Sequence, residues 1–145
     1  MIYTIVMQRD HKWLKFRLET IWKRYFPDIV IVNNVLVKFG RASMTRLGSI
    51  KYGRQRENRN TIITINGHFK DLEIPEFVID AVLAHELTHY AHGFFNPNGQ
   101  IKRFPHKGGV VHKEMTGRGL ENLLKLEKKW IKENWRGYIK ANHFK

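Results

Sequence analysis

Hydrophobic residues near the start of the chain recur at the spacing of one helix face. The apolar positions are Leu14, Leu18, Ile21, Trp22 and Tyr25. Charged residues fill the positions between them, as on an amphipathic helix with one buried side. Asp10 suits the N-cap and Pro27 ends the pattern, so the sequence predicts a helix over residues 11–26.

Three stretches that follow are rich in β-branched residues and predict strands. Residues 28–40 hold two such runs around an Asn-Asn pair, which predicts two paired strands or one strand with a break. Residues 46–53 predict another short strand. Apolar and polar residues alternate over residues 60–66, which end in an Asn-Gly turn, so we expect a further strand there.

Two further helices are predicted in the second half of the chain. Pro75 suits the start of a helix and Gly93 its end, so residues 75–93 are expected to be helical. Gly, Pro and Asn mark residues 94–110 as a loop. A last helix is predicted from Val111 to Ile139. Its apolar positions are Leu120, Leu123, Leu124, Leu126, Trp130, Ile131 and Trp135, and its weak positions are Gly117, Gly119 and Gly137.

This order of elements predicts an α+β fold. We expect a small, mainly antiparallel sheet packed against the N-terminal helix, the 75–93 helix and a long C-terminal helix. The chain has 145 residues, with no internal repeat and no linker rich in Pro, Gly or Ser. Residues 1–145 are therefore expected to form a single domain.

Composition excludes several classes of function. There is no cysteine, so disulfides, thiolate nucleophiles and cysteine-based zinc ribbons are excluded. The only serines are Ser43 and Ser49, and neither lies in the G-x-S-x-G motif of serine hydrolases. No apolar run approaches the roughly 20 residues of a membrane span, and the first residues lack the features of a signal peptide. We therefore expect a cytoplasmic protein without membrane contact.

A large excess of positive charge favours a polyanionic partner. Lys and Arg number 26 against 13 Asp and Glu, a formal net charge of +13, and such an excess is typical of proteins that bind nucleic acid. Two basic clusters with aromatic neighbours are the better candidates for DNA contacts. They consist of Lys51, Arg54, Arg56 and Arg59, and of Lys102, Arg103 and Lys107. The lysines of the last helix fit a solvated face instead.

Three polar residues inside an apolar helix carry the strongest chemical signal. His85, Glu86 and His89 spell H-E-x-x-H within VIDAVLAHELTHYAHG, residues 78–93. Positions i and i+4 project from one helix face, so the two imidazoles can bind one zinc ion. Glu86 is rotated by about 100° around the axis, away from the ligand pair and toward a water on the metal. This arrangement is typical of the zinc-binding helix of metallopeptidases.

A catalytic zinc site has a third protein ligand and an open position. His92 lies about 10 Å along the helix axis from His85, so we interpret it as a supporting or substrate-facing group. The downstream candidates for the third ligand are His106, His112, Glu114, Glu121 and His143. His112 is preferred because it opens the last helix after a glycine-rich loop. His106 is the alternative, or a substrate-facing group, and Glu114 applies if the ligand is a carboxylate.

With these motifs the chain resembles the SprT-like (Spartan-type) zinc metallopeptidases. The resemblance spans residues 10–135 and rests on a basic aromatic N-terminal helix, a small sheet, HELTHYAHG, a loop and VHKEMTGRGLENLLK. It implies a zincin-like fold and proteolysis of DNA-bound proteins. It also implies His85, His89 and His112 as zinc ligands and Glu86 as general base. The chain departs from the family at residues 112–116, which read HKEMT where the family often has His-Gly-x-x-Phe.

The sequence thus predicts a zinc metallopeptidase in which a water, activated by the metal and by Glu86, attacks a peptide bond. The strand over residues 60–66 is a candidate edge for an extended substrate. The alternatives are a non-catalytic nucleic-acid-binding domain with a structural metal, a zinc hydrolase of non-peptide substrates, and an inert histidine-rich core. A zinc deaminase is disfavoured, since those sites use cysteine ligands.

Overall fold

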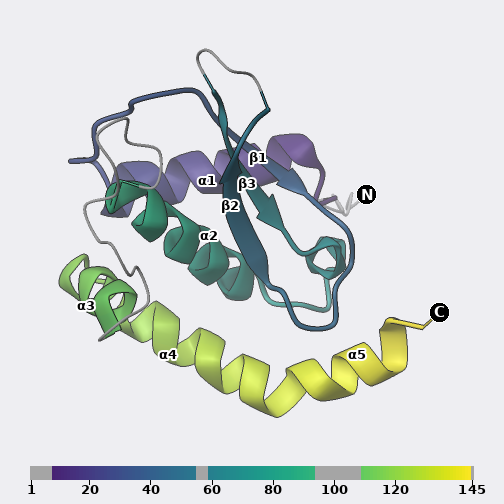
Figure 1. Cartoon of the computed structure of the whole chain (residues 1–145). Coiled ribbons are helices and arrows are strands. Elements are labelled where there is room, and N and C mark those ends of the chain that lie inside the picture. Colours follow the sequence, from purple (N-terminus) through teal and green to yellow (C-terminus); the bar gives the residue numbers. More distant parts are fainter. Residues whose placement is uncertain (1–7, 55–58, 94–108, 145) are drawn as a thin grey trace, which may run out of the picture.

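A computed structural model describes residues 8–54, 59–93 and 109–144 of the chain (Figure 1). The strands are β1 (Val35–Phe39), β2 (Gly48–Tyr52) and β3 (Thr61–Ile65). The helices are α1 (His11–Tyr25), the 3₁₀ turn η1 (Gly67–Lys70), α2 (Glu76–Ala91), α3 (Val110–Gly117), α4 (Glu121–Trp130), the π-helical η3 (Ile131–Trp135) and α5 (Arg136–Asn142). These elements confirm the predicted α+β class. No helix within the described ranges is both long and apolar enough to cross a bilayer.

The N-terminal helix α1 forms where the sequence predicts it. The Asp10 carboxylate accepts a hydrogen bond from the Trp13 backbone N–H at 2.9 Å, which satisfies one of the free donors of the first turn. The buried side holds Trp13, Leu14, Leu18 and Ile21. Arg17 donates two hydrogen bonds to the Asp80 carboxylate of α2, at 2.9 and 2.7 Å. The two side chains are only 17% and 13% exposed, so a largely buried ion pair joins α1 to α2.

The sheet is mixed rather than mainly antiparallel, which corrects the prediction. The strand order is β1-β3-β2, with β1 parallel to β3 and β2 antiparallel to β3. The prediction is wrong because β3 lies between β1 and β2, so the first two strands do not pair with each other. β3, the strand predicted over residues 60–66, is therefore central and offers no free edge to a substrate. The edges of the described sheet are β1 and β2.

Only the second β-branched run of residues 28–40 forms a strand. β1 begins at Val35, whereas residues 30–32 lie outside the sheet and are each at least 53% exposed. The Tyr90 hydroxyl of α2 donates a hydrogen bond to Asn33 Oδ1 at 2.8 Å and accepts one from the Val32 backbone N–H at 3.1 Å. The first run is thus anchored to a helix side chain instead of a neighbouring strand.

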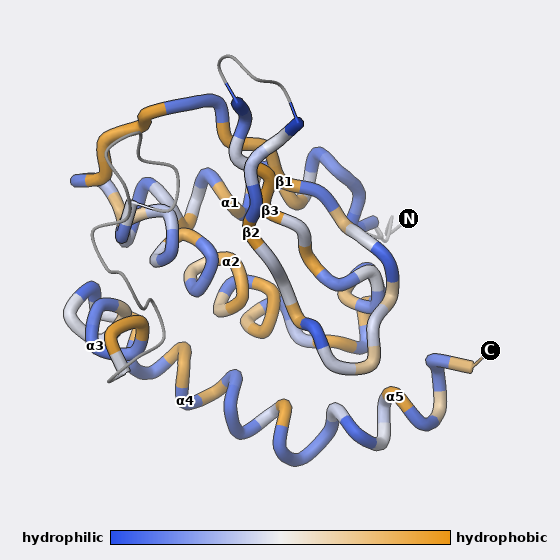
Figure 2. Tube along the Cα trace, viewed as in Figure 1, coloured by the Kyte–Doolittle hydropathy of each residue, from blue (hydrophilic) through white to orange (hydrophobic). Residues whose placement is uncertain are grey.

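The second helix, α2, is the centre of the fold. It contacts α1, β2, β3, α3 and α4, and Val37, Ile63 and Ile65 of the sheet belong to the same core. Figure 2 shows hydrophobic residues along its first half and polar residues toward its end. Its buried apolar residues include Val78, Ile79, Ala81, Val82, Leu83, Ala84 and Leu87. A helix that is apolar on all sides belongs inside a domain, so the H-E-x-x-H motif lies on the most buried helix described.

The predicted C-terminal helix is broken near its start. α3 ends at Gly117 and α4 begins at Glu121. Between them Gly119 has a φ of 85°, in the left-handed region that glycine adopts readily and that ends helices. From α4 the chain continues through η3 and α5 as a bent helical segment below α2 and the sheet in the view of Figure 1. The Tyr138 hydroxyl donates a hydrogen bond of 2.7 Å to the Asp71 carboxylate, which fastens α5 to the segment after η1.

Candidate metal centre and active site

The helix α2 places the imidazoles of His85 and His89 side by side. Their Nε2 atoms lie 3.2 Å apart. In a tetrahedral zinc site with Zn–N bonds of 2.0–2.1 Å, two nitrogen ligands lie roughly 3.3 Å apart. A hydrogen bond between two neutral imidazole rings has a similar length. A bound ion would replace this hydrogen bond between the two nitrogens. His89 is 9% exposed and His85 is half-buried. The pair therefore has the spacing of two ligands of one zinc ion.

The carboxyl group of Glu86 lies buried beside this pair. Glu86 is 5% exposed, and in the part of the chain that the structure describes it forms no hydrogen bond or ion pair. Burial raises the pKa of Glu86 to about 7, since desolvation disfavours the ionised form, while the charge of Arg46 acts in the opposite direction. A buried carboxyl group without a partner is costly, which indicates a place where a cation, water or substrate binds.

A cavity of about 450 Å³ opens onto His85 and Glu86. Four segments build it: α2, the loop between β1 and β2, the first residue of β2, and α4. The lining residues are Thr45, Arg46, Leu47, Gly48, Val82, His85, Glu86 and Glu127. We call this cavity the metal pocket, because His85 of the histidine pair and the buried carboxyl group of Glu86 line it.

Two charged residues that line the metal pocket, Glu127 and Arg46, are not among the site residues predicted from the sequence. Glu127 reaches it from α4, where burial raises the pKa of its carboxyl group to about 7 against the opposing charge of Lys128. A signal for Glu127 does exist: it follows Leu123 and Leu124 at i+4 and i+3, on the inward stripe of the helix. Arg46 carries no such signal, because it lies on a loop without periodicity.

The strand β2 approaches α2 too closely at Gly48 for a side chain to fit. A Cβ atom at this position would lie 2.6 Å from Val82 Cγ1 and 3.4 Å from Glu86 Oε1. Val82 is β-branched and lies in a helix, so its χ1 angle is restricted and its methyl group does not move aside easily. The missing side chain at Gly48 therefore sets how close the loop wall of the metal pocket lies to Glu86.

We expect Gly48→Ala to destabilise the domain by about 1–3 kcal/mol, the usual cost of adding a methyl group to a packed interior. The free energy of unfolding in urea measures this change. Gly137→Ala is the matched control, because a Cβ atom there meets nothing within 4 Å. Alanine is the better helix former, so this control should stabilise α5 by up to about 1 kcal/mol. Similar effects of both substitutions would contradict the close approach at Gly48.

The structure brings His85 and His89 together but does not add His112 to them. Among the residues that the structure describes, no three His, Asp or Glu side chains lie close enough to hold one metal ion. His112 is exposed in the first turn of α3. Three other candidates contact different residues: Glu114 contacts His92, Glu121 contacts Lys125, and His143 contacts His68. His106 lies outside the described residues, so the third ligand stays a prediction.

The buried imidazole of His92 links the end of α2 to α3. His92 is the C-cap of α2 and is 6% exposed, and its Nε2 atom lies 3.1 Å from Glu114 Oε1. Glu114 in turn lies 3.6 Å from Arg118 Nε, and Arg118 donates a hydrogen bond to the Tyr25 carbonyl of α1. These contacts connect α2, α3 and α1, so the His92 side chain takes part in the packing of three helices.

Three of the predicted DNA contacts lie in the described part of the chain: Lys51, Arg54 and Arg59. Lys51 and Arg54 are exposed. The Arg59 guanidinium lies over the Tyr52 ring, 4.8 Å from its centroid, a cation–π contact. The predicted contacts outside the described residues are Arg56, Lys102, Arg103 and Lys107. The described basic residues of the first cluster thus flank the connection between β2 and β3.

Comparisons of the chain with protein-family models, with curated proteins and with solved structures found no match. The resemblance to SprT-like metallopeptidases therefore rests on the motifs and the order of elements in this chain alone. The chemistry of the metal pocket is the basis on which a function can be inferred.

Proposed function

We propose that the chain is a zinc-dependent metallopeptidase of the H-E-x-x-H type. The observation that carries the proposal is the 3.2 Å separation of the His85 and His89 Nε2 atoms next to the buried carboxyl group of Glu86. Imidazole nitrogens suit zinc, and their spacing fits its tetrahedral geometry. His85 and His89 would hold the ion together with a third ligand, for which His112 and His106 are the candidates.

The proposed reaction is hydrolysis of a peptide bond. When bound, zinc lowers the pKa of a coordinated water toward ~7 and polarises the scissile carbonyl group. Glu86 accepts the proton of the attacking water and delivers it to the leaving amine. Burial suits Glu86 to this task, because it brings the pKa of the carboxyl group closer to neutral pH. Arg46 adds positive charge to the pocket in which the carbonyl oxygen becomes negative.

An extended substrate is expected to lie along β2 rather than β3. β2 is an edge strand of the described sheet, and its first residue, Gly48, lines the metal pocket together with His85 and Glu86. A peptide that pairs with this edge adds one strand to the sheet and passes beside the pocket. Main-chain hydrogen bonds to β2 would then hold the scissile bond near Glu86.

The finer proposal is that the substrates are proteins associated with DNA. Its support is the net charge of +13, which favours a polyanionic partner, together with the SprT-like resemblance. The alternative is a non-catalytic nucleic-acid-binding domain with a structural metal. Peptide hydrolysis that depends on Glu86 separates the two, because a structural metal site needs no general base.

Elemental analysis of the purified chain tests the metal centre. We expect about one zinc per chain in the wild type and a loss of most of it in His89→Ala, because catalytic zinc sites rely on three protein ligands. His68→Ala is the control and should keep the zinc. Parallel His106→Ala and His112→Ala variants identify the third ligand, since only the variant that removes a ligand should lose metal. Wild-type protein without a transition metal would overturn the proposal.

A further inference from the structure

The face of the sheet that points away from the core is open, and its half nearest the loop between β1 and β2 is polar. The other half holds the apolar residues Leu36 and Ile62. Val37 is 3% exposed and faces the core, so its neighbours along β1 face the other way, as side chains alternate along a strand. On this outer face Lys38, Thr64 and Ser49 lie in register across the three strands. Lys51 follows Ser49 by two residues and so lies on the same face. Both lysines are exposed.

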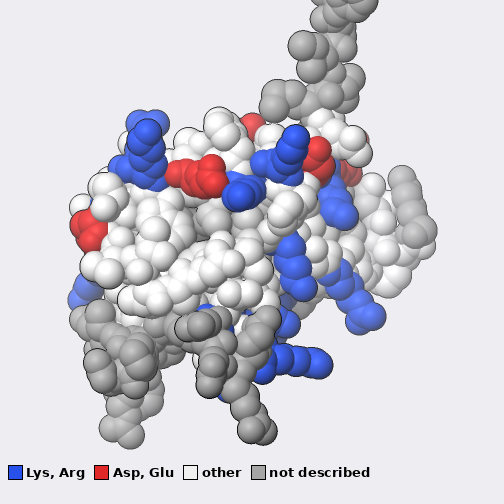
Figure 3. All heavy atoms as spheres, turned by 90° about the horizontal axis from the view of Figure 1, so that it is seen from above, with Lys and Arg blue, Asp and Glu red and all other residues white. Residues whose placement is uncertain are grey.

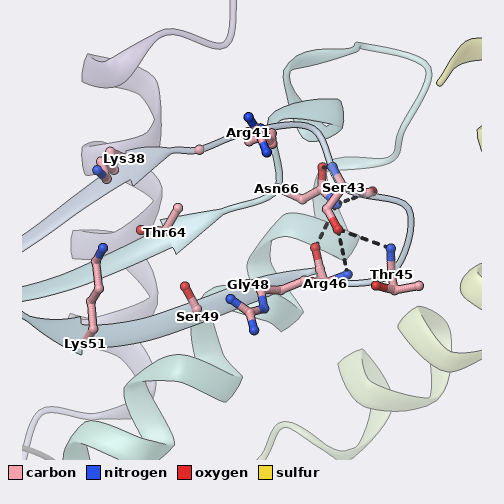
Figure 4. A pocket seen from close by; sticks show the side chains of 11 residues that line it. Lys38, Arg41, Ser43, Thr45, Arg46, Gly48, Ser49, Lys51, Thr64 and Asn66 are labelled. Atoms are coloured by element: carbon pink, nitrogen blue, oxygen red, sulfur yellow. Dashed lines mark hydrogen bonds between the residues drawn. The ribbon is translucent and has the colours of Figure 1, made fainter. Parts of the chain in front are cut away.

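The loop between β1 and β2 closes one end of this face (Figure 4). The Asn66 side-chain amide donates hydrogen bonds to the Ser43 and Arg46 carbonyls, each at 2.8 Å, and Ser43 Oγ accepts one from the Arg46 backbone N–H at 3.1 Å. These bonds fix the loop on which Arg41 and Arg46 are exposed. Loop and strands surround a cavity of about 530 Å³. We call it the basic hollow, after Lys38, Arg41, Arg46 and Lys51.

The side chains that line the basic hollow carry positive charge and no negative charge. Its lining includes these four cations and no Asp or Glu, and its other polar side chains are Ser43, Thr45, Ser49, Thr64 and Asn66. Within the described ranges none of the four cations takes part in an ion pair. In Figure 3, Lys and Arg gather without Asp or Glu among them on the lower right part of the visible face, whereas Asp and Glu lie beside Lys and Arg along its upper edge. Like charges repel one another, so the hollow suits an anion.

The distance between the cations of the basic hollow favours a ligand with several negative charges over a single anionic group. Lys38 and Lys51 lie on the two edge strands, which are about 10 Å apart across β3. A phosphodiester backbone carries charge over such a distance at regular spacing, and Lys, Arg, Ser, Thr and Asn side chains are its usual partners. No aromatic side chain lines the hollow, so it offers no surface on which a base can stack. Contacts to the backbone alone are independent of base sequence.

We propose that the basic hollow binds the phosphodiester backbone of nucleic acid, without regard to base sequence. This site differs from the clusters predicted from sequence, since Lys38, Arg41 and Arg46 belong to neither. The inference deepens the proposed function and rests on it for its role in catalysis. The binding itself requires neither the metal nor Glu86.

The basic hollow and the metal pocket share a wall. Thr45, Arg46 and Gly48 line both cavities. A nucleic acid in the hollow would therefore run beside the entrance to the metal pocket, and a protein attached to it would be held close to Glu86. Such an arrangement raises the effective concentration of a DNA-bound substrate at the site without any contact to the substrate itself.

Fluorescence anisotropy with a short labelled DNA duplex tests the proposal on the full chain. The variant Lys38→Gln/Arg41→Gln/Lys51→Gln removes three charges from the hollow and leaves Arg46 in place. Its matched control, Lys128→Gln/Lys129→Gln/Lys132→Gln, removes three exposed charges from α4 and η3. We expect the hollow variant to bind at least about tenfold more weakly, with the slope of log K against log salt reduced by roughly 2–3. The control should change both quantities much less.

Three outcomes would overturn the proposal. One is an equal loss of affinity in the two triple variants, which would show that only net charge matters. Another is unchanged binding by the hollow variant at an unchanged melting temperature. The third is that poly-glutamate displaces the labelled duplex more effectively than unlabelled duplex does, which would assign the hollow to acidic polypeptides. If the hollow variant melts early, the single variants Lys38→Gln and Lys51→Gln replace it. A chain without zinc or peptidase activity can still pass this test, so the two proposals fail separately.

Discussion

Replacing Glu86 with Gln is expected to lower kcat/KM for a denatured protein substrate by about 10²–10⁴-fold, the usual contribution of a general base, while zinc content stays at the wild-type level. Gln has the shape of Glu but cannot accept the proton of the attacking water. The His85 and His89 Nε2 atoms, 3.2 Å apart on the same helix, are not altered by this change. Cleavage of an unfolded, fluorescently labelled protein measures the rate, and elemental analysis of the same samples measures the metal.

Glu127→Gln is the matched control for this variant, because it also neutralises a carboxyl group of the metal pocket, here a half-buried one. We expect it to lose much less activity. A Glu86→Gln variant that cleaves as fast as wild type would show that the mechanism is wrong. A larger loss in Glu127→Gln than in Glu86→Gln would move the role of general base to α4. Wild-type protein that holds zinc and cleaves nothing would support the alternative of a structural metal.

Replacing Arg17 with Met is expected to lower the free energy of unfolding by about 3 kcal/mol, near the lower end for breaking a buried ion pair. Arg17 binds both oxygens of the Asp80 carboxylate, at 2.9 and 2.7 Å, and Asp80 is 13% exposed. Desolvation raises the pKa of Asp80, against the hydrogen bonds and charge of Arg17 that lower it. Without Arg17 the carboxylate stays buried between α1 and α2, and only the smaller effect of the Arg9 charge offsets its lost hydration. Urea unfolding of both proteins at neutral pH measures the difference.

The effect of Arg17→Met should depend on pH with a definite sign. In the variant the pKa of Asp80 in the folded state rises further above its unfolded value, because desolvation then acts unopposed by the guanidinium. The folded protein then binds a proton that the unfolded chain releases, so stability falls as pH rises through the folded-state pKa. Destabilisation that is independent of pH would argue against a buried carboxylate. The double variant Arg17→Met/Asp80→Leu should recover most of the loss, since it removes both charges together.

The features of the site that lie on one helix follow from the sequence. The apolar positions of α1 and its Asp10 cap are local signals, and they predict the helix within one residue at its end. The side-by-side placement of His85 and His89 is likewise a property of i and i+4 spacing. These predictions succeed because helix periodicity and capping depend on neighbours within one or two turns, whatever the rest of the chain does.

Such local signals do not predict contacts between segments that are far apart in the sequence. Nothing in the β-branched runs reveals that β3 inserts between β1 and β2 and so leaves β2 as the edge beside the metal pocket. Arg46 and Glu127 join the pocket only because a loop and α4 both pack against α2. The break at Gly119 was visible as a weak helix position, but its positive φ depends on how α3 and α4 pack.

Because α2 is largely buried in the core, the proposed metal site differs from a zinc finger in whether folding depends on the ion. A zinc finger is disordered until its ion arrives, so coordination has to assemble the whole module. Here an apolar core surrounds the helix that carries His85 and His89, and that helix alone places the two imidazoles side by side. Under the proposed function, zinc would act as an ordinary ligand of a folded domain. We expect it to raise the melting temperature by mass action once its free concentration exceeds the dissociation constant.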